Sequence, residues 1–375
     1  MSKLAIKFRS DSAGAWTLNN PTLAFGEIGM QIDSADGVAP KFKIGNGINA
    51  WNDSATKYFI NDSDQAGLGG GGGGSGPAWI GDRGLVNTHG ENNTGNLDYF
   101  DITTTGNASA FGAYHHGTHK IGMSTTGGTR FLLAGGSYGT SATNEIEYFT
   151  TTTTGDGTDF GDLTGTSRYG CAASNGTYGL LCCGTKDGTS GSNRSATIDY
   201  VTIATTANAA DFGDMTLSRS NFGAGQDATH CLFASGHSTS ATYNNTIDYV
   251  TAATPGNATD FGDLTVACAE TNGCSNATKS LFCIGYTGSV VNTIDQVTTA
   301  TAANSTDFGD LATARYAVGA CCNATRAVIC GGPNASFGTT NIMEYIDFAS
   351  GGTASDHGDL SASQEYITAS SGPAS

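Results

Sequence analysis

A five-residue phrase recurs along this chain at a nearly constant interval, and this interval restricts the fold more than any other feature. Four clear copies have the pattern Asp-Phe-Gly-Asp followed by Leu or Met, and two further copies are degenerate. The central positions are Phe111, Phe160, Phe212, Phe261, Phe308 and His357, separated by 49, 52, 49, 47 and 49 residues. A period of roughly 50 residues is typical of kelch-like propeller blades and other repeat arrays. The interval therefore predicts a repeat architecture and disfavours a single-site enzyme.

Each repeat carries two further recurring segments before the phrase. An apolar-acidic-aromatic step, such as residues 198–200, stands about thirteen residues upstream, and an apolar run ending in glycine, such as residues 180–184, precedes it. These segments are short, rich in β-branched and aromatic residues, and separated by Gly, Asn, Ser and Thr, which indicates strands. In the repeat around Phe212 we expect four strands, at residues 168–173, 178–184, 198–205 and 211–216.

The phrase itself has a structural explanation. We expect its Phe to pack between neighbouring blades, its Gly to permit close approach of the backbone, and its acids to cap a turn. Asp-Phe-Gly is not a kinase motif here, because the Gly-rich loop, the lysine and the catalytic-loop signatures are missing from the sequence. Four antiparallel strands on this period form a propeller blade.

The two ends of the repeat region predict a closed ring. The first repeat has only a short lead-in at residues 77–80, whereas residues 361–370 resemble the innermost strand that follows Phe308. We therefore expect the C-terminal strand to complete the first blade, which hides edge strands. The predicted fold is all-β: a small N-terminal β module followed by a six-bladed, kelch-like β-propeller with four strands per blade, closed by the C-terminal strand.

Composition changes before the repeats begin. Residues 1–60 contain no copy of the repeat, and residues 61–76 include six consecutive glycines. A Gly-rich segment of this kind behaves as a flexible chain. The predicted organisation is a β domain at 1–60, a Gly-rich linker at 61–76 and the propeller at 77–375.

Charge and hydropathy exclude several classes of partner. The formal net charge is −17 and no basic run exists, so nucleic-acid binding through phosphate neutralisation is not expected. The N-terminus lacks the apolar core of a signal peptide, and no 18-residue apolar run is present. We therefore expect no membrane insertion.

Cysteines and histidines raise the question of a disulfide or metal site. The ten cysteines fall in or beside the two inner strands of the repeats, where they act as small apolar residues, so we expect free, buried thiols, with some disulfide as the alternative. His115, His116 and His119 form the one histidine cluster, and residues 61–64 resemble half a calcium loop. We expect neither to bind a metal. No catalytic or cofactor motif is found, so we expect no cofactor, no catalytic residues and no enzyme activity.

The first 60 residues resemble a known phage module. In order they give a basic start, a tryptophan, Pro-x-Leu-Ala-x-Gly-Glu-Ile-Gly, Lys-Phe-Lys-Ile-Gly-x-Gly and Trp-Asn-Asp, at residues 6–11, Trp16, 20–29, 41–47 and 50–53. This string resembles the N-terminal virion-anchoring domain of the bacteriophage major tropism determinant, which is also found on phage tail and head fibres. The resemblance covers residues 4 to about 60.

Two features depart from the pattern of that domain. Residues 34–40 are an insertion where a tight turn is usual, and Asn46 stands where Asp is usual. Neither touches the core pattern. The propeller separately resembles phage kelch-like repeat proteins, although only at the level of the repeat pattern.

These resemblances imply a bacteriophage virion structural protein, assembled in the host cytoplasm and exposed on the particle surface. We expect a tail fibre or adhesin, with residues 1–60 bound to other virion proteins and the propeller contacting a host surface glycan or protein. A homo-oligomer such as a trimer is compatible with this role. The alternatives are a capsid fibre or decoration protein without receptor binding and, third, a glycan-degrading enzyme.

The predicted receptor-binding face is the one formed by the loops between the second and third strands. These loops differ most between repeats, at residues 137–145, 185–197, 237–246, 286–293 and 333–342. Variable loops on a rigid scaffold are common binding sites. The candidate residues are Tyr138, Tyr243, Tyr286 and Phe337 in the loops and Arg168, Arg219 and Arg315, which we expect at the start of inner strands. The alternative is that these arginines satisfy only carbonyls or acids of the scaffold.

Overall fold

The chain divides into two compact units, Met1–Ser75 and Gly76–Ser375. The computed structural model describes residues 8–11, 28–31, 41–44, 58–60, 80–89, 95–115, 122–138, 141–186, 193–239 and 242–373. All regular structure in these residues is β-strand. The described segments thus contain no helix that could cross a membrane.

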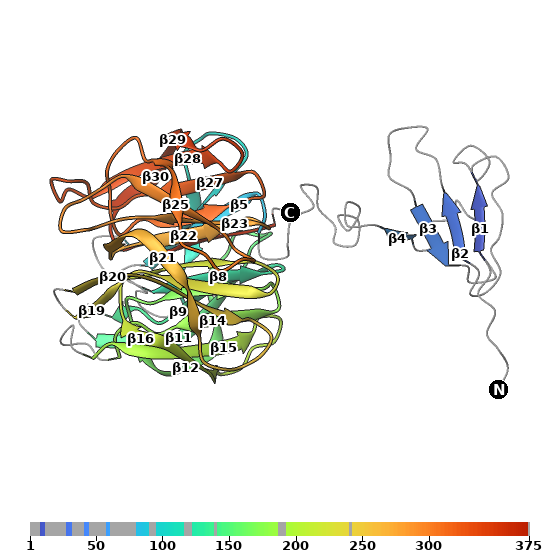
Figure 1. Cartoon of the computed structure of the whole chain (residues 1–375), viewed down its shortest axis with the longest axis horizontal. Coiled ribbons are helices and arrows are strands. Elements are labelled where there is room, and N and C mark those ends of the chain that lie inside the picture. The colour runs from blue at the N-terminus through green and yellow to red at the C-terminus, as the bar shows by residue number, and fades with distance from the viewer. Residues whose placement is uncertain are drawn as a thin grey trace. The chain divides into compact units, whose positions relative to one another are not determined.

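The first unit contains one small sheet (Figure 1). Its strands are β1 (Phe8–Asp11), β2 (Ile28–Gln31), β3 (Lys41–Ile44) and β4 (Tyr58–Ile60), in that order across the sheet. β1 and β2 are parallel, whereas the other two pairs are antiparallel. The predicted small β module is therefore confirmed; the Gly-rich segment at 61–76 lies outside the described residues.

The second unit is a propeller of six blades, and the main strands of each blade follow one another from the axis outward. Blade 1 comprises β31 (Ala369–Gly372), β5 (Arg83–His89), β6 (Gly95–Asp101) and β7 (Ser109–Ala113). Blade 2 comprises β8 (Met123–Gly127), β9 (Arg130–Ala134), β11 (Ser141–Thr150) and β12 (Thr158–Ser167). Blade 3 comprises β13 (Cys171–Ser174), β14 (Tyr178–Cys182), β15 (Ser195–Thr202) and β16 (Ala210–Arg219).

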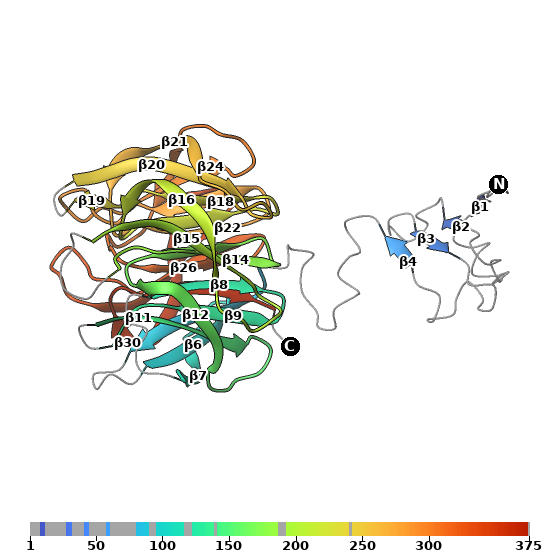
Figure 2. The same ribbon diagram turned by 90° about the horizontal axis from the view of Figure 1, so that it is seen from below.

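The remaining blades repeat this arrangement, and Figure 2 shows the succession from cyan β6 through green β12 to yellow β20. Blade 4 comprises β17 (Gly223–Gln226), β18 (His230–Ala234), β20 (Thr242–Thr251) and β21 (Thr259–Cys268). Blade 5 comprises β22 (Asn272–Ser275), β23 (Lys279–Cys283), β24 (Thr293–Thr298) and β25 (Thr306–Asp310). Blade 6 comprises β26 (Gly319–Cys322), β27 (Arg326–Cys330), β28 (Thr340–Asp347) and β30 (Ser355–Gln364). Short additional strands are β10 (Ser137–Tyr138), β19 (His237–Thr239) and β29 (Gly352–Thr353).

Closure by the C-terminal strand is confirmed. β31 pairs antiparallel with β5, and Ala369 lies opposite Val86. The first and last parts of the propeller therefore share one sheet. Six blades, the predicted number, are formed.

The core is divided into six apolar clusters, one at each boundary between blades. At the boundary of blades 2 and 3, Phe160 of the repeated phrase packs with Leu181 and Val201 of the next blade. The other five boundaries contain equivalent clusters. The prediction that the phenylalanine packs between blades is thus confirmed, and it explains why the phrase recurs once per blade.

The acid of the apolar-acidic-aromatic step fastens each blade to the one before it. These six acids are 0–3% exposed: Asp98, Glu147, Asp199, Asp248, Asp295 and Glu344. Each accepts a hydrogen bond from a backbone N–H just beyond the phrase of the preceding blade. Asp98 and Ser361 make this contact across the closure, with the Ser361 nitrogen 3.0 Å from the carboxylate.

The expectation that the acids of the phrase cap a turn is wrong for most copies. The turn between the third and fourth strands of the next blade supplies the cap instead: the Asn208 side chain accepts from the Asp162 N–H at 3.1 Å. Asn257, Asn304 and Asn107 do the same in other blades. The glycine of the phrase permits this docking, because Gly213 has a φ of 146° and a Cβ there would clash with the Gly256 carbonyl.

All ten cysteines are free, and all but the half-buried Cys171 are buried. Burial raises the pKa of Cys183 and of Cys283 to about 12, so these thiols carry almost no thiolate at neutral pH. The predicted role of cysteine as a small apolar residue is confirmed for the described chain.

Candidate functional site

One face of the propeller is built from two kinds of loop. The connections between blades form β-bridges to the loops between second and third strands, in the pairs Arg168 with Thr185, Ser220 with His237, Ala269 with Tyr286, and Arg315 with Asn334. The two kinds of loop therefore lie on the same face. We call this the loop face.

A ring of residues with an unusual backbone conformation surrounds the axis on the loop face. Each stands two or three residues before an inner strand and has a φ between 49° and 62°: Tyr169, Asn221, Glu270, Ala317 and Tyr366. We call these five residues the axial ring. Backbone hydrogen bonds join successive members, such as Glu270 N–H to the Asn221 carbonyl at 2.9 Å.

The residue types of the axial ring are not the ones that its backbone conformation favours. Positive φ favours Gly and Asn and is unfavourable for bulky residues. Only one of the five positions is Asn and none is Gly, whereas two are Tyr and one is Glu. Strained positions that keep large side chains are characteristic of functional sites.

Two cavities meet at the axial ring. The inner cavity, of about 60 Å³, is lined by residues from all six blades, including Ser124, Asn272 and Thr368. The outer cavity, of about 270 Å³, lies on the loop side and is lined by Arg168, Arg194 and others. Tyr169, Asn221, Glu270 and Tyr366 line both cavities.

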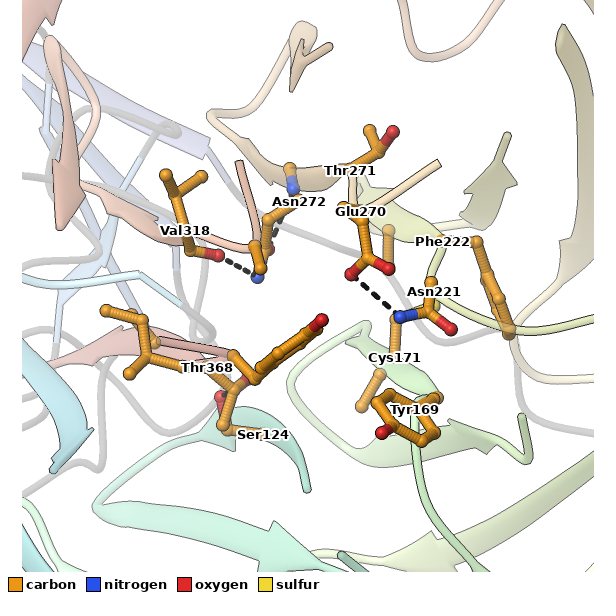
Figure 3. Close-up of a pocket in the computed structure, with 18 of the residues that line it drawn as sticks. Ser124, Tyr169, Cys171, Asn221, Phe222, Glu270, Thr271, Asn272, Val318 and Thr368 are labelled. Carbon is orange, nitrogen blue, oxygen red and sulfur yellow. Dashed lines mark hydrogen bonds between the residues drawn. The ribbon is translucent and has the colours of Figure 1, made fainter. Parts of the chain in front are cut away.

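Glu270 is the central titratable group of this site. Figure 3 shows its carboxylate joined to Asn221, whose side-chain nitrogen donates to Oε2 at 2.7 Å. Burial is the main cause that raises the pKa of Glu270 to about 7, and the charge of Glu365 adds to it. Such shifted carboxyl groups are frequent at functional sites.

Tyrosines gather around Glu270. The Tyr169 and Tyr366 rings are 5.8 Å apart in an edge-to-face arrangement. Burial raises the pKa of Tyr169, Tyr243, Tyr316 and Tyr366, and the charge of Glu270 contributes to each shift. The carboxylate therefore lies near four phenol rings.

A continuous row of aromatic rings crosses the loop face from blade 4 to blade 6. Its members are His237, Tyr243, Tyr286, Tyr316 and Phe337, with successive ring centroids 5.0, 6.0, 5.9 and 6.2 Å apart. We call this set the aromatic row. Phe337 is 67% exposed and the other four are half-buried.

The structure brings together three of the predicted binding residues. Tyr243, Tyr286 and Phe337 belong to the aromatic row, whereas the side chain of Tyr138 lies outside the described residues. His237 and Tyr316 were not among the residues predicted from the sequence. Tyr316 lies in a connection between blades and not in a loop between second and third strands. Tyr316 directly precedes Ala317 of the axial ring, a position that can be recognised only once the strand register is known.

Two of the three predicted arginines are part of the scaffold. Arg219 is the last residue of β16 and not the start of an inner strand, and its side chain is 0% exposed and 3.0 Å from Asp248. Arg315 is 1% exposed and lies 3.2 Å from Glu344. Because both guanidinium groups are enclosed between blades, we do not include them in the candidate site.

Arg168 differs from these arginines by one residue of register. It follows the phrase phenylalanine by eight positions, whereas Arg219 and Arg315 follow theirs by seven. The structure accordingly places Arg168 beside the outer cavity, half-buried, with its guanidinium carbon 5.2 Å from the Tyr169 ring centroid. It remains a candidate for ligand contact.

Neither the search for metal-binding groups nor the comparison with known proteins assigns a further role to this site. Within the described residues, no group of three or more His, Cys, Asp or Glu side chains is placed to hold a metal ion. His116 and His119 lie outside those residues, and His115 is exposed. Comparisons with protein-family models and with curated proteins give no match.

Proposed function

We propose that this chain is a bacteriophage virion structural protein, and specifically a tail fibre or adhesin whose propeller contacts a host surface receptor. Residues 1–60 would bind other virion proteins, and the loop face would contact the host. The proposal joins the resemblance of the first 60 residues to a virion-anchoring domain with the character of the loop face.

The aromatic row is the observation that carries the proposed binding role. Rings from three successive blades meet in one line, and Phe337 exposes most of its surface. Exposing such rings to water is unfavourable, and aromatic residues are enriched at the centres of binding interfaces. Tyrosine rings combine an apolar face with a hydroxyl, which suits the faces and hydroxyl groups of sugars. We therefore favour a host glycan as the receptor.

The test is to replace Tyr243, Tyr286 and Phe337 together with alanine in the full chain. We expect binding of the purified protein to host cells to fall at least about tenfold, because each ring contributes more than 1 kcal/mol at a typical hot spot. A matched control replaces Thr153, Thr205 and Thr254, exposed threonines in turns on the opposite face. If the folded triple variant binds cells as well as the control, the loop face is not the receptor site.

A capsid fibre or decoration protein is the alternative. Such a protein would also begin with a domain that resembles the virion-anchoring domain, but it requires no receptor. The same cell-binding assay separates the two, because a decoration protein with an intact loop face would not bind host cells.

Glu270 is the one observation that favours a glycan-degrading enzyme. Glycoside hydrolases use a carboxyl group of raised pKa as the general acid together with a second carboxylate. Glu270 has a pKa of about 7, and Glu365 lies near enough to raise it. Release of oligosaccharides from host polysaccharide, lost in Glu270→Gln, would favour this function over simple adhesion.

A further inference from the structure

The inner cavity holds a single charged side chain. Its described lining comes from all six blades and consists of small, polar and aromatic residues, and Glu270 is the one charged member. A single water needs roughly 10–15 Å³. A cavity of about 60 Å³ therefore has room for several waters or one small headgroup, but not for a whole saccharide.

Glu270 has no cation to balance its charge within the described structure. The side chain is 13% exposed, and its nearest basic group is His237, with Nε2 at 3.9 Å from Oε1. Burial and the charge of Arg194 lower the pKa of His237, so this imidazole is largely neutral at neutral pH. The bond from Asn221 satisfies only one carboxylate oxygen. A buried, uncompensated carboxylate is unfavourable unless a cation joins it.

The aromatic rings near Glu270 also favour a cationic ligand. Aromatic faces attract cations within about 6 Å, and rings combined with an acid recognise ammonium groups. Tyr169 and Tyr366 line the inner cavity together with Glu270, and their two rings contact each other edge-to-face with centroids 5.8 Å apart. These residues keep bulky side chains at positions where glycine would be less strained.

We propose that the inner cavity binds an organic ammonium group, with Glu270 as the counter-ion and with Tyr169 and Tyr366 as the aromatic rings of the cavity wall. The group would be the protonated amine of an amino sugar or the quaternary ammonium of a choline-type headgroup. This inference rests on the proposed binding role of the loop face and adds a second contact at its axis. Neutral N-acetylated sugars and anionic sugars would not satisfy the carboxylate.

Binding should increase with pH. The facing groups are His237, Arg168 and Arg194 around the outer cavity, Glu365 beside the ring, and the tyrosines, whose raised pKa keeps their phenols neutral. Glu270 is the group among these that changes charge near neutrality, with a pKa of about 7. A cation prefers the ionised carboxylate, so affinity for choline, whose charge does not depend on pH, should rise between about pH 6 and pH 8.

The experiment measures binding of glucosamine, choline and N-acetylglucosamine to the full chain by calorimetry or ligand-observed NMR. We expect glucosamine, choline or both to bind, which identifies the source of the ammonium group, and N-acetylglucosamine to bind at least about tenfold more weakly. Glu270→Gln should lose about tenfold or more in affinity for the ammonium ligand, because the bound cation loses its counter-charge.

Two controls keep the test decisive. Asp211→Asn removes an exposed acid of β16 and should bind as the original chain does. A melting curve of Glu270→Gln establishes whether the variant is folded. If it is not folded, the pH dependence of ligand binding by the unsubstituted chain serves as the test instead. The proposal is overturned if neither ammonium ligand binds, if the N-acetylated sugar binds equally well, or if folded Glu270→Gln binds unchanged. None of these results would affect the cell-binding test of the aromatic row.

Discussion

At the scale of single residues, buried ionic side chains connect neighbouring blades. Asp248 accepts hydrogen bonds from the Thr216 hydroxyl at 2.6 Å and from Arg219 at 3.0 Å, and both ionic side chains are fully buried. Arg219 in turn donates to the carbonyls of Phe233 and Thr246. Blades 3 and 4 are therefore joined by one buried polar network.

Asp248→Asn should destabilise the propeller strongly. The substitution leaves the Arg219 guanidinium buried without its counter-charge, and breaking a buried pair in this way costs about 3–5 kcal/mol. Denaturant unfolding measures the effect. Asp347→Asn is the matched control, because Asp347 is 48% exposed in its pair with Arg326 and should contribute about 1 kcal/mol or less. Equal effects of the two substitutions would contradict the role assigned to the buried network.

Glu270→Gln should change how stability depends on pH. The folded chain holds this proton up to about pH 7, whereas an unfolded glutamate loses it near about pH 4.3. The original chain therefore loses stability as pH rises between these values, and a glutamine does not titrate. The melting temperature of the variant relative to the original should increase by a few degrees from about pH 5 to about pH 8. A constant difference across this range would show that Glu270 titrates normally.

At the scale of elements, closure depends on one short strand. β31 supplies the inner strand of blade 1 and pairs with β5 over four residues. Its Ala369 and the preceding Ile367 also belong to the apolar cluster between blades 6 and 1. Without β31, the inner edge of β5 would leave its backbone groups unpaired.

Deleting residues 365–375 should therefore abolish soluble, folded protein. Unpaired backbone groups are costly, and an open edge promotes aggregation. Size-exclusion chromatography and thermal unfolding measure the outcome. Deletion of residues 373–375 alone, which spares β31, is the control and should leave both unchanged. An unchanged melting temperature after the longer deletion would argue against closure by this strand.

The sequence was sufficient to predict the blades but not the residues of the candidate binding face. The period, the phrase and the short apolar runs determine strand number and closure because each reflects local periodicity and packing between neighbouring blades. The different place of Arg168 follows from one residue of register relative to Arg219; the sequence contains this offset, but its consequence for burial appears only in the structure. The axial ring assembles from positions about 50 residues apart, and the aromatic row joins residues of three blades, so their contacts appear only when the blades are placed around the axis.

At the scale of the whole molecule, we propose that the chain combines an anchoring module with a rigid binding scaffold. The two units are compact separately, and the candidate binding features lie within the propeller unit. Loops on a rigid scaffold can vary without loss of the fold, which suits a protein that must recognise a host surface. The central claim is therefore that this chain is a component of a virion that displays its propeller outward.

Electron microscopy of purified phage particles labelled with antibodies against the propeller tests this claim most directly. We expect label at the exposed ends of tail fibres or at the tail tip, in each particle that carries the chain. Label confined to the capsid would favour the fibre or decoration protein over the adhesin. Particles that contain no label, from a preparation in which the free protein is labelled well, would contradict the claim that this chain belongs to a virion.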